Sequence, residues 1–230
     1  MLTLAGKTAI VTGASRGLGR AIAAAFMEQG AFVHATGRDH RAMAETEERL
    51  RTFGDHFSMQ PLDVTDEASV EAFIASVNRI DLLVNNAGIA RAGPFVETPT
   101  ETLREVLEVN VIAAFVLMRE AVRKMIAAGG GQIINIASDA AVRGIGRMAP
   151  YVASKHALLG PGRSLAREVR SRGIRVTTYC PGPINTNILG SGSPAALNPE
   201  HVAASIVQIA ALPPEMEVRE ILVEPMTMDI

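Results

Sequence analysis

A glycine-rich turn between a predicted strand and a predicted helix constrains the fold of this 230-residue chain most strongly. Residues 8–12 form a short β-branched apolar run, residues 12–19 read TGASRGLG, and a helical pattern begins at Gly17. Glycines let the backbone turn tightly and approach a ligand, and the start of the helix offers unpaired N–H groups to an anion. The arrangement predicts a pyrophosphate-binding turn, and the flanking strand and helix disfavour a turn without a ligand.

Short β-branched runs alternate with longer helical patterns along the whole chain. The predicted strands are residues 8–12, 32–36, 82–85, 132–136, 175–179 and 220–223, with a weaker one at 57–60. The predicted helices are residues 17–29, 40–52, 67–78, 99–128, 151–171 and 199–211. This alternation predicts an α/β fold: a Rossmann-like, doubly wound, parallel seven-stranded sheet with helices on both faces and ligands at the carboxyl ends of the strands. Without a linker or repeat, residues 1–230 are expected to form a single dinucleotide-binding and catalytic domain.

Composition narrows the possible partners and the compartment. Hydrophobic residues make up 48% and charged residues 20% of the chain, enough apolar material for a large core. A net charge of -2 without a basic cluster predicts no nucleic acid and no membrane surface as partner. Cys180 is the single cysteine, which excludes an internal disulfide and a thiolate zinc cluster. With no signal pattern and no apolar run near the roughly 20 residues of a membrane span, a soluble, cytoplasmic protein is expected.

The end of the second predicted strand indicates which dinucleotide is bound. The Rossmann pattern places an acidic residue about 20 positions after the turn, where it grips the adenosine ribose. Gly37 occupies that place, and the guanidinium groups of Arg16 and Arg38 are available for a 2′-phosphate, which predicts NADP(H) rather than NAD(H). Asp39 opposes this preference, and Arg38 alone would be interpreted as a solvated charge. Asp63 is expected either to accept a hydrogen bond from adenine or to cap a turn.

Three residues could carry out proton transfer. Tyr151 and Lys155 lie four apart in a predicted helix, so their side chains share one face. The pKa of a free tyrosine is about 10, and an adjacent ammonium group is expected to lower it towards the working range of a general acid or base. Ser138 follows the strand 132–136 at the ligand edge, where it could hydrogen-bond a carbonyl oxygen or only cap a turn.

Asn110 is a fourth candidate because it lies in the predicted helix 99–128, an unfavourable place for asparagine. A polar side chain in such a position needs a hydrogen-bond partner. Two interpretations remain open: Asn110 is satisfied within the protein, or it holds a water molecule that leads away from Lys155.

Together these positions resemble the short-chain dehydrogenase/reductase family over almost the whole chain, from Gly6 to the last strand. Besides the turn, the family's Asn-Asn-Ala-Gly segment appears at residues 85–88 and its Pro-Gly segment at residues 181–182. The resemblance implies that the tyrosine protonates the carbonyl, the serine polarises it, the lysine also holds the nicotinamide ribose and the asparagine maintains a proton relay. The implied catalytic residues are Asn110, Ser138, Tyr151 and Lys155. The implied cofactor-binding residues are Gly13, Ser15, Arg16, Gly17, Leu18, Gly19, Arg38, Asp63, Val64, Asn86, Ala87, Gly88, Tyr151, Lys155, Pro181, Gly182, Ile184 and, at the nicotinamide carboxamide, Thr186.

Two departures from the family pattern affect the expectations. Pro161 falls inside a helix that packs between subunits in many relatives, and a helix-interior proline costs about 3 kcal/mol. A homodimer or homotetramer is expected, with a kinked helix or an altered interface. Residues 187–198 are shorter than the substrate lid of many relatives, which predicts an open or mobile substrate loop.

The resulting hypothesis is an NADP(H)-dependent oxidoreductase that transfers a hydride between nicotinamide and a carbonyl or secondary alcohol, with no metal. The substrate is expected to be a 3-ketoacyl or 3-hydroxy acid compound or a small ketone or aldehyde. The alternatives are an NAD-dependent alcohol dehydrogenase of the same fold and a non-catalytic NADPH-sensing protein. An apolar substrate wall is expected from Ile145, Met148, Pro183 and Ile184, while Arg91, Arg143 and Arg147 are expected to meet solvent rather than an anionic substrate.

Overall fold

A seven-stranded parallel sheet forms the centre of the protein, as the sequence predicts. The computed structural model describes residues 3–186 and 195–226. The strands are β1 (Thr8–Val11), β2 (Phe32–Gly37), β3 (Phe57–Pro61), β4 (Leu82–Asn85), β5 (Gly131–Ile136), β6 (Ile174–Pro181) and β7 (Glu220–Val223). They lie in the order β3-β2-β1-β4-β5-β6-β7, and every adjacent pair is parallel. The strand order changes direction between β1 and β4: β2 and β3 continue the sheet on the β1 side, and β5, β6 and β7 continue it on the β4 side. Doubly wound folds bind ligands at such a switch point.

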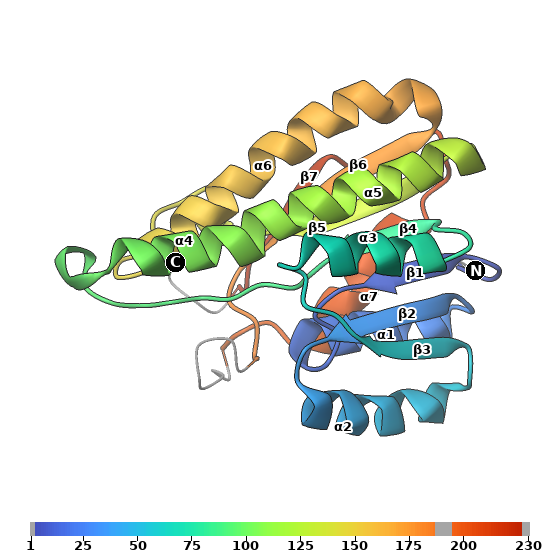
Figure 1. Ribbon diagram of the computed structural model, residues 1–230, viewed down its shortest axis with the longest axis horizontal. Helices are drawn as coiled ribbons and strands as arrows, with labels where there is room; N and C mark the ends of the chain where they lie inside the picture. The colour runs from blue at the N-terminus through green and yellow to red at the C-terminus, as the bar shows by residue number, and fades with distance from the viewer. Residues whose placement is uncertain (1–2, 187–194, 227–230) are drawn as a thin grey trace.

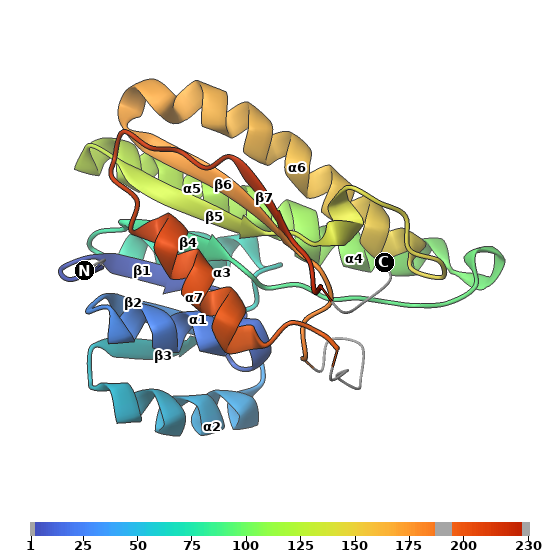
Figure 2. The same cartoon turned by 180° about the vertical axis from the view of Figure 1, so that it is seen from behind.

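Helices cover both faces of the sheet. They are α1 (Gly17–Glu28), α2 (His40–Leu50), α3 (Glu67–Ser76), α4 (Thr100–Leu107), α5 (Ala113–Ala128), α6 (Ala149–Val169) and α7 (Pro199–Ala210). Figure 1 shows α3, α5 and α6 in front of the sheet, and Figure 2 shows α1 and α7 on the opposite face. Among the described residues, 3–186 and 195–226, no helix combines the length and the apolar character that crossing a membrane requires.

The sheet divides the core into two apolar clusters because neighbouring residues of a strand face opposite sides. Val11 packs with α1 and α7, whereas the preceding Ile10 packs with α3 and α5. Both faces of the central strands are therefore buried, which explains why their sequences are continuous apolar runs. Because the faces are covered, the ends of the strands are the parts of the sheet left open to a ligand.

The prediction of one continuous α-helix over residues 99–128 is wrong. The segment consists of α4, a π-helical turn at Glu108–Ile112, and α5. The π turn contains Asn110, whose side chain bonds to groups outside its own helix. Single π turns of this kind are often found at functional sites.

Helix α6 runs from Ala149 to Val169 without a break at Pro161, so the expected kink does not interrupt the helix (Figure 1). Gly162, the residue after Pro161, explains how closely α6 packs against the sheet. A Cβ atom on Gly162 would lie 2.8 Å from Thr178 Oγ1 on β6, so the glycine lets the helix approach the sheet closely. The altered subunit interface stays a prediction. Most of the predicted substrate loop at 187–198 lies outside the described residues.

Candidate active site

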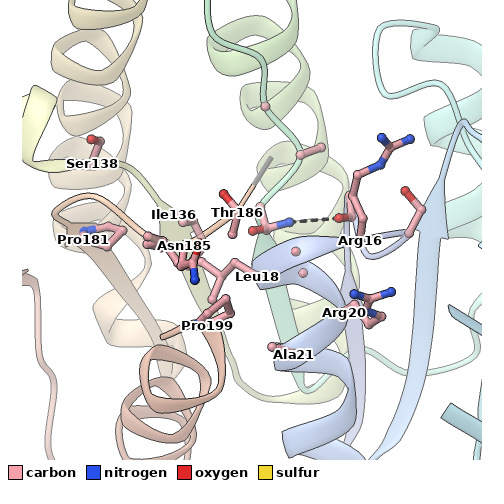
Figure 3. Close-up of a pocket in the computed structure, with 18 of the residues that line it drawn as sticks. Arg16, Leu18, Arg20, Ala21, Ile136, Ser138, Pro181, Asn185, Thr186 and Pro199 are labelled. Carbon is pink, nitrogen blue, oxygen red and sulfur yellow. Dashed lines mark hydrogen bonds between the residues drawn. The ribbon is translucent and has the colours of Figure 1, made fainter. Parts of the chain in front are cut away.

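A cleft of about 1270 Å³ opens at the carboxyl ends of the strands, where the fold predicts a ligand. Figure 3 shows Arg16 and Arg20 on one side of this cleft and Ser138 and Pro181 on the other. The cleft brings together almost all of the predicted site residues: Gly13, Ser15, Arg16, Gly17, Leu18, Gly19, Arg38, Val64, Asn86, Ala87, Gly88, Ser138, Tyr151, Lys155, Pro181, Gly182, Ile184 and Thr186. Asp63 and Asn110 are the two that do not line it.

The glycine-rich turn is packed so tightly that side chains are excluded from it. Gly13 has a φ of +64°, and a Cβ atom there would lie 2.8 Å from the Cα atom of Ala87. A Cβ atom on Gly19 would overlap the carbonyl oxygen of Gly13 and lie 2.5 Å from Asn86 Nδ2. Asn86 fixes the turn by donating Nδ2 hydrogen bonds to the carbonyl oxygens of Thr12 (2.8 Å) and Gly13 (3.2 Å). The bare backbone and the N-terminus of α1 therefore form a cradle suited to a phosphate group.

Gly37 at the end of β2 leaves no room for the acidic residue that grips an unphosphorylated ribose. A Cβ atom on Gly37 would lie 2.8 Å from the Cβ atom of Ser15. Any larger residue would have to displace the glycine-rich turn, because that distance is shorter than real side chains adopt. The local packing therefore matches a ribose that is recognised by arginines rather than by a carboxylate.

Two arginines at this end of the cleft are paired with carboxylates. Arg16 forms an ion pair with Asp39, and Arg38 Nη1 lies 3.6 Å from Asp63 Oδ2. All four side chains are exposed, so each pair is weak in water and can exchange for a phosphate. Asp63 also accepts hydrogen bonds from the backbone N (3.0 Å) and Oγ1 (2.8 Å) of Thr65. Of the two interpretations of Asp63, the capped turn is the one that the structure shows.

Tyr151 and Lys155 lie at the start of α6, with Lys155 Nζ 5.6 Å from the centre of the tyrosine ring. Lys155 is buried and donates a hydrogen bond to the carbonyl oxygen of Ile136 (2.9 Å). Burial raises the pKa of Tyr151 to about 12, although a hydrogen bond with Ser138 acts in the opposite direction. Burial lowers the pKa of Lys155 to about 8. The expected lowering of the tyrosine pKa is therefore wrong for this structure, because burial of the phenol outweighs the interactions that favour its ionised form.

Ser138 caps the short 3₁₀ helix η4 (Asp139–Ala141) that follows β5. Its Oγ accepts a hydrogen bond from the backbone N of Ala140 (3.1 Å) and donates one to Asp139 Oδ1 (2.7 Å). Ser138 also lies beside Tyr151, where its hydroxyl acts to lower the pKa of the phenol against the larger effect of burial. The turn-capping interpretation of Ser138 is thus correct in part, and the same hydroxyl remains in contact with the phenol.

Asn110 connects two parts of the site from behind the cleft. Its Nδ2 donates to the carbonyl oxygen of Ile89 (2.9 Å) and to Ser154 Oγ (2.9 Å), and its Oδ1 accepts from the backbone N of Ile89 (2.8 Å). Asn110 is therefore satisfied within the protein, one of the two interpretations that the sequence left open. A Cβ atom on Gly88 would lie 3.2 Å from Asn110 Oδ1 and 3.7 Å from Lys155 Nζ, so the asparagine lies close to the lysine. The water relay stays a prediction.

The predicted site residues leave out several polar residues of the cleft, among them Arg20 and Asp139. Arg20 lines the cleft one helical turn after Arg16 (Figure 3), a spacing that could have indicated it. Asp139 lines the cleft next to Ser138, and its spacing of four from Arg143 indicates an ion pair. Both residues were overlooked because they stand outside the motifs that mark the site.

The predicted substrate end of the cleft is partly as expected. Arg147 and Arg91 are exposed as predicted, and Arg91 also pairs with the exposed Glu105 (2.6 Å). The prediction is wrong for Arg143, which is partly buried and pairs with the buried Asp139. The four residues of the predicted apolar wall all line the cleft: Ile145, Met148, Pro183 and Ile184.

Burial of Lys155 predicts a pH-dependent cost to stability. Its pKa is about 8 in the folded protein against 10.5 for an ordinary lysine, so below about pH 8 the fold must bury an ammonium group. The penalty disappears as the pH rises from about 8 to 10.5, because the unfolded chain then binds more protons than the folded one. Lys155→Met should therefore be more stable than the wild type at pH 7, by about 1–3 kcal/mol.

Urea unfolding from pH 7 to pH 10.5 tests this cost. The difference in unfolding free energy between the wild type and Lys155→Met should shrink as the pH rises. A pH-independent difference for Lys155→Met would contradict the burial penalty.

Comparison with known proteins places this geometry in a family. The family model described as short chain dehydrogenase matches residues 7–196. The chain is 36% identical over 214 residues to the 3-oxoacyl-[acyl-carrier-protein] reductase FabG of Vibrio cholerae, covering 91% of this chain and 84% of that protein. Among solved structures, the alcohol dehydrogenase of the archaeon Thermococcus sibiricus complexed with 5-hydroxy-NADP superposes with a TM-score of 0.90 at 26% identity, covering 97% of this chain and 98% of that one. A metagenomic short-chain oxidoreductase in complex with NADP gives a TM-score of 0.86 at 33% identity, covering 98% of this chain and 99% of that one. The matched sequence, the parallel sheet and the cleft at its carboxyl edge together establish that this chain is an oxidoreductase of the short-chain dehydrogenase/reductase family.

Proposed function

We propose that the protein is an NADP(H)-dependent oxidoreductase that interconverts a carbonyl compound and a secondary alcohol. The observation that carries the proposal is that one continuous cleft joins the glycine-rich turn and its arginines to Ser138, Tyr151 and Lys155. Two structural relatives that contain NADP or its 5-hydroxy derivative support the choice of cofactor. The excluded carboxylate at Gly37 supports it independently.

The residues of the cleft fit a dinucleotide phosphate along its length. The side-chain-free backbone from Gly13 to Gly19 would hold the pyrophosphate, and Arg16 and Arg38 would hold the 2′-phosphate. At the other end, Lys155 would hold the nicotinamide ribose and Thr186 the carboxamide. When bound, NADPH supplies a hydride to the substrate carbonyl carbon.

The protein's own chemistry is proton transfer to the substrate oxygen. In reduction, the Tyr151 hydroxyl donates its proton to the oxygen as negative charge develops there. Lys155 lies one helical turn after Tyr151 in α6 and stabilises the phenolate that remains after the proton is transferred. Ser138 lines the same cleft and would hydrogen-bond the substrate oxygen as charge develops there. Because burial raises its pKa, Tyr151 keeps its proton in the resting protein, as the acid for carbonyl reduction must.

The proposed substrates are 3-ketoacyl or 3-hydroxy acid compounds, or small ketones and aldehydes. The apolar wall of Ile145, Met148, Pro183 and Ile184 fits the carbon chain of such compounds. The Vibrio cholerae relative is named as a 3-oxoacyl reductase, which supports the first class. A panel of β-ketoacyl thioesters, ketoesters, aldehydes and sugars, assayed with NADPH, tests the proposal. Turnover of at least one class is expected, whereas tight NADPH binding without turnover of any would favour the NADPH-sensing alternative.

Cofactor preference provides a separate prediction. The wild type should have a higher kcat/KM for NADPH than for NADH, and Arg38→Gln should reduce that ratio by about ten- to a hundredfold, since it removes one charge-assisted contact to the 2′-phosphate. Activity with NADH should change little.

Arg41→Gln is the matched control for Arg38→Gln. Arg41 is a neighbouring arginine that is almost fully exposed, pairs with Glu45 and does not line the cleft. The ratio of kcat/KM values in this variant should equal that of the wild type. A wild-type preference for NADH would refute the assignment of Arg16 and Arg38 and favour the NAD-dependent alternative.

A further inference from the structure

Asp39 is a carboxylate of the cofactor cleft that the proposed function does not use. It lines the cleft next to Arg38, and its Oδ2 accepts a hydrogen bond from Arg16 Nη2. Both arginines proposed for the 2′-phosphate are thus occupied in this structure, Arg16 by Asp39 and Arg38 by Asp63. Together the four side chains carry no net charge, so a phosphate must compete for its guanidinium partners.

A second hydrogen bond fixes the position of Asp39. The residue is the N-cap of α2, and its Oδ1 accepts from the backbone N of Ala42 (3.1 Å). This bond satisfies one of the N–H groups that have no partner within the helix, so moving the carboxylate away would uncap α2. The same bond is the main cause of the lowered pKa of Asp39, which keeps the side chain ionised at neutral pH. The negative charge therefore stays beside Arg16 when a ligand arrives.

Asp63 differs from Asp39 in its relation to the cleft. Asp63 does not line the cleft, and its Oδ2 lies 3.6 Å from Arg38 Nη1. Its Oδ1 accepts from the backbone N and the Oγ1 of Thr65, on the turn after β3. A phosphate that binds Arg16 must therefore replace a carboxylate within the cleft, whereas one that binds Arg38 meets no carboxylate of that pair there.

We propose that Asp39 is a specificity-determining residue for the cofactor, because it competes with the 2′-phosphate for Arg16. A phosphate on Arg16 leaves Asp39 unpaired beside a group with a charge of about −1.5 to −2 at pH 7, and the two repel each other. NADH has a hydroxyl group in that place, which can donate a hydrogen bond to a carboxylate. Asp39 thus reduces the preference for NADPH that Arg16 and Arg38 create. The inference rests on the proposed use of NADP(H).

Cofactor binding tests the inference without a substrate. Calorimetric titration gives the Kd values of NADPH and NADH, which differ only in the 2′-phosphate. Asp39→Asn should raise the ratio of the Kd for NADH to the Kd for NADPH about tenfold, since asparagine keeps the capping oxygen and removes only the charge. The corresponding ratio of kcat/KM values should rise in the same direction. Thermal unfolding should change little, because asparagine and aspartate are equally good N-caps.

Two controls separate this effect from capping and from general charge. Asp66→Asn makes the same change at the N-cap of α3, where Asp66 accepts from the backbone N of Ser69 (3.2 Å) and does not line the cleft. Glu200→Gln removes a carboxylate that does line the cleft, in the first turn of α7. Both variants should keep the wild-type ratio of Kd values.

An unchanged or lower ratio in Asp39→Asn would overturn the inference. An equal rise in Glu200→Gln would also overturn it, because the effect would then belong to the charge of the whole cleft. If Asp39→Asn does not fold, Asp39→Ser decides by the same criterion, since serine also caps helices. A wild type that binds neither cofactor would refute the proposed function together with the inference, whereas binding of both with an unchanged ratio in Asp39→Asn would refute the inference alone.

Discussion

Tyr151→Phe is expected to lower kcat for carbonyl reduction by about a hundred- to ten-thousandfold, the usual contribution of a positioned general acid. The substitution removes one hydroxyl group and keeps the ring that lies against Lys155. The fold and the binding of NADPH should therefore be preserved. Because the lost interaction is made as charge develops on the substrate oxygen, kcat and kcat/KM should fall together.

Steady-state kinetics and an NADPH titration of the same Tyr151→Phe preparation separate the two properties. Tyr179→Phe is the matched control, because Tyr179 is the other tyrosine of the chain, lies in the core and bonds to Ser205 Oγ (2.6 Å). That variant should lose some stability and keep its kcat. Near wild-type turnover by Tyr151→Phe would show that another group delivers the proton.

Gly19→Ala should abolish NADPH binding at concentrations that saturate the wild type, with Kd raised at least about a hundredfold. The added Cβ atom would overlap the carbonyl oxygen of Gly13 and press on Asn86, so the turn must open. Overpacking of this kind also costs about 1–3 kcal/mol of stability, and here the obstacle is rigid backbone. Both effects follow from one methyl group because the cradle is made of backbone alone.

Binding is measured by titrating NADPH into Gly19→Ala, and folding is checked by thermal unfolding. The control is Gly160→Ala in α6, where a Cβ atom would meet no other atom within 4 Å. This variant should bind NADPH normally and be slightly more stable, since alanine favours a helix. A folded Gly19→Ala protein with wild-type affinity would mean that the cofactor does not use this turn.

Most of the fold could be predicted from the sequence because parallel strands and covering helices have different periodicities. The predicted bounds of β4 and β7 agree with the structure. The π turn at Glu108–Ile112 could not be predicted, since the apolar spacing continues through it and the cause lies in contacts of Asn110 with distant segments. Tertiary hydrogen bonds, absent from any local pattern, determine that turn.

The candidate active site, like the fold, could be predicted only where local sequence motifs mark it. The glycine-rich turn and the pair Tyr151–Lys155 could be identified because they are local motifs. The direction of the Tyr151 pKa shift could not, because it depends on burial by segments that are remote in sequence. Asp139 was missed for a related reason: an acidic residue after a serine is ordinary until the structure shows that it is buried in the cleft.

The most direct test of the account is isotope transfer. A carbonyl substrate found in the panel is reduced with NADPH that carries deuterium at both C4 positions of the nicotinamide, and the product is examined by mass spectrometry and NMR. The account predicts one deuterium atom in each product molecule, at the carbinol carbon, with the hydroxyl proton coming from solvent through Tyr151. A reduced product without deuterium at that carbon would contradict it.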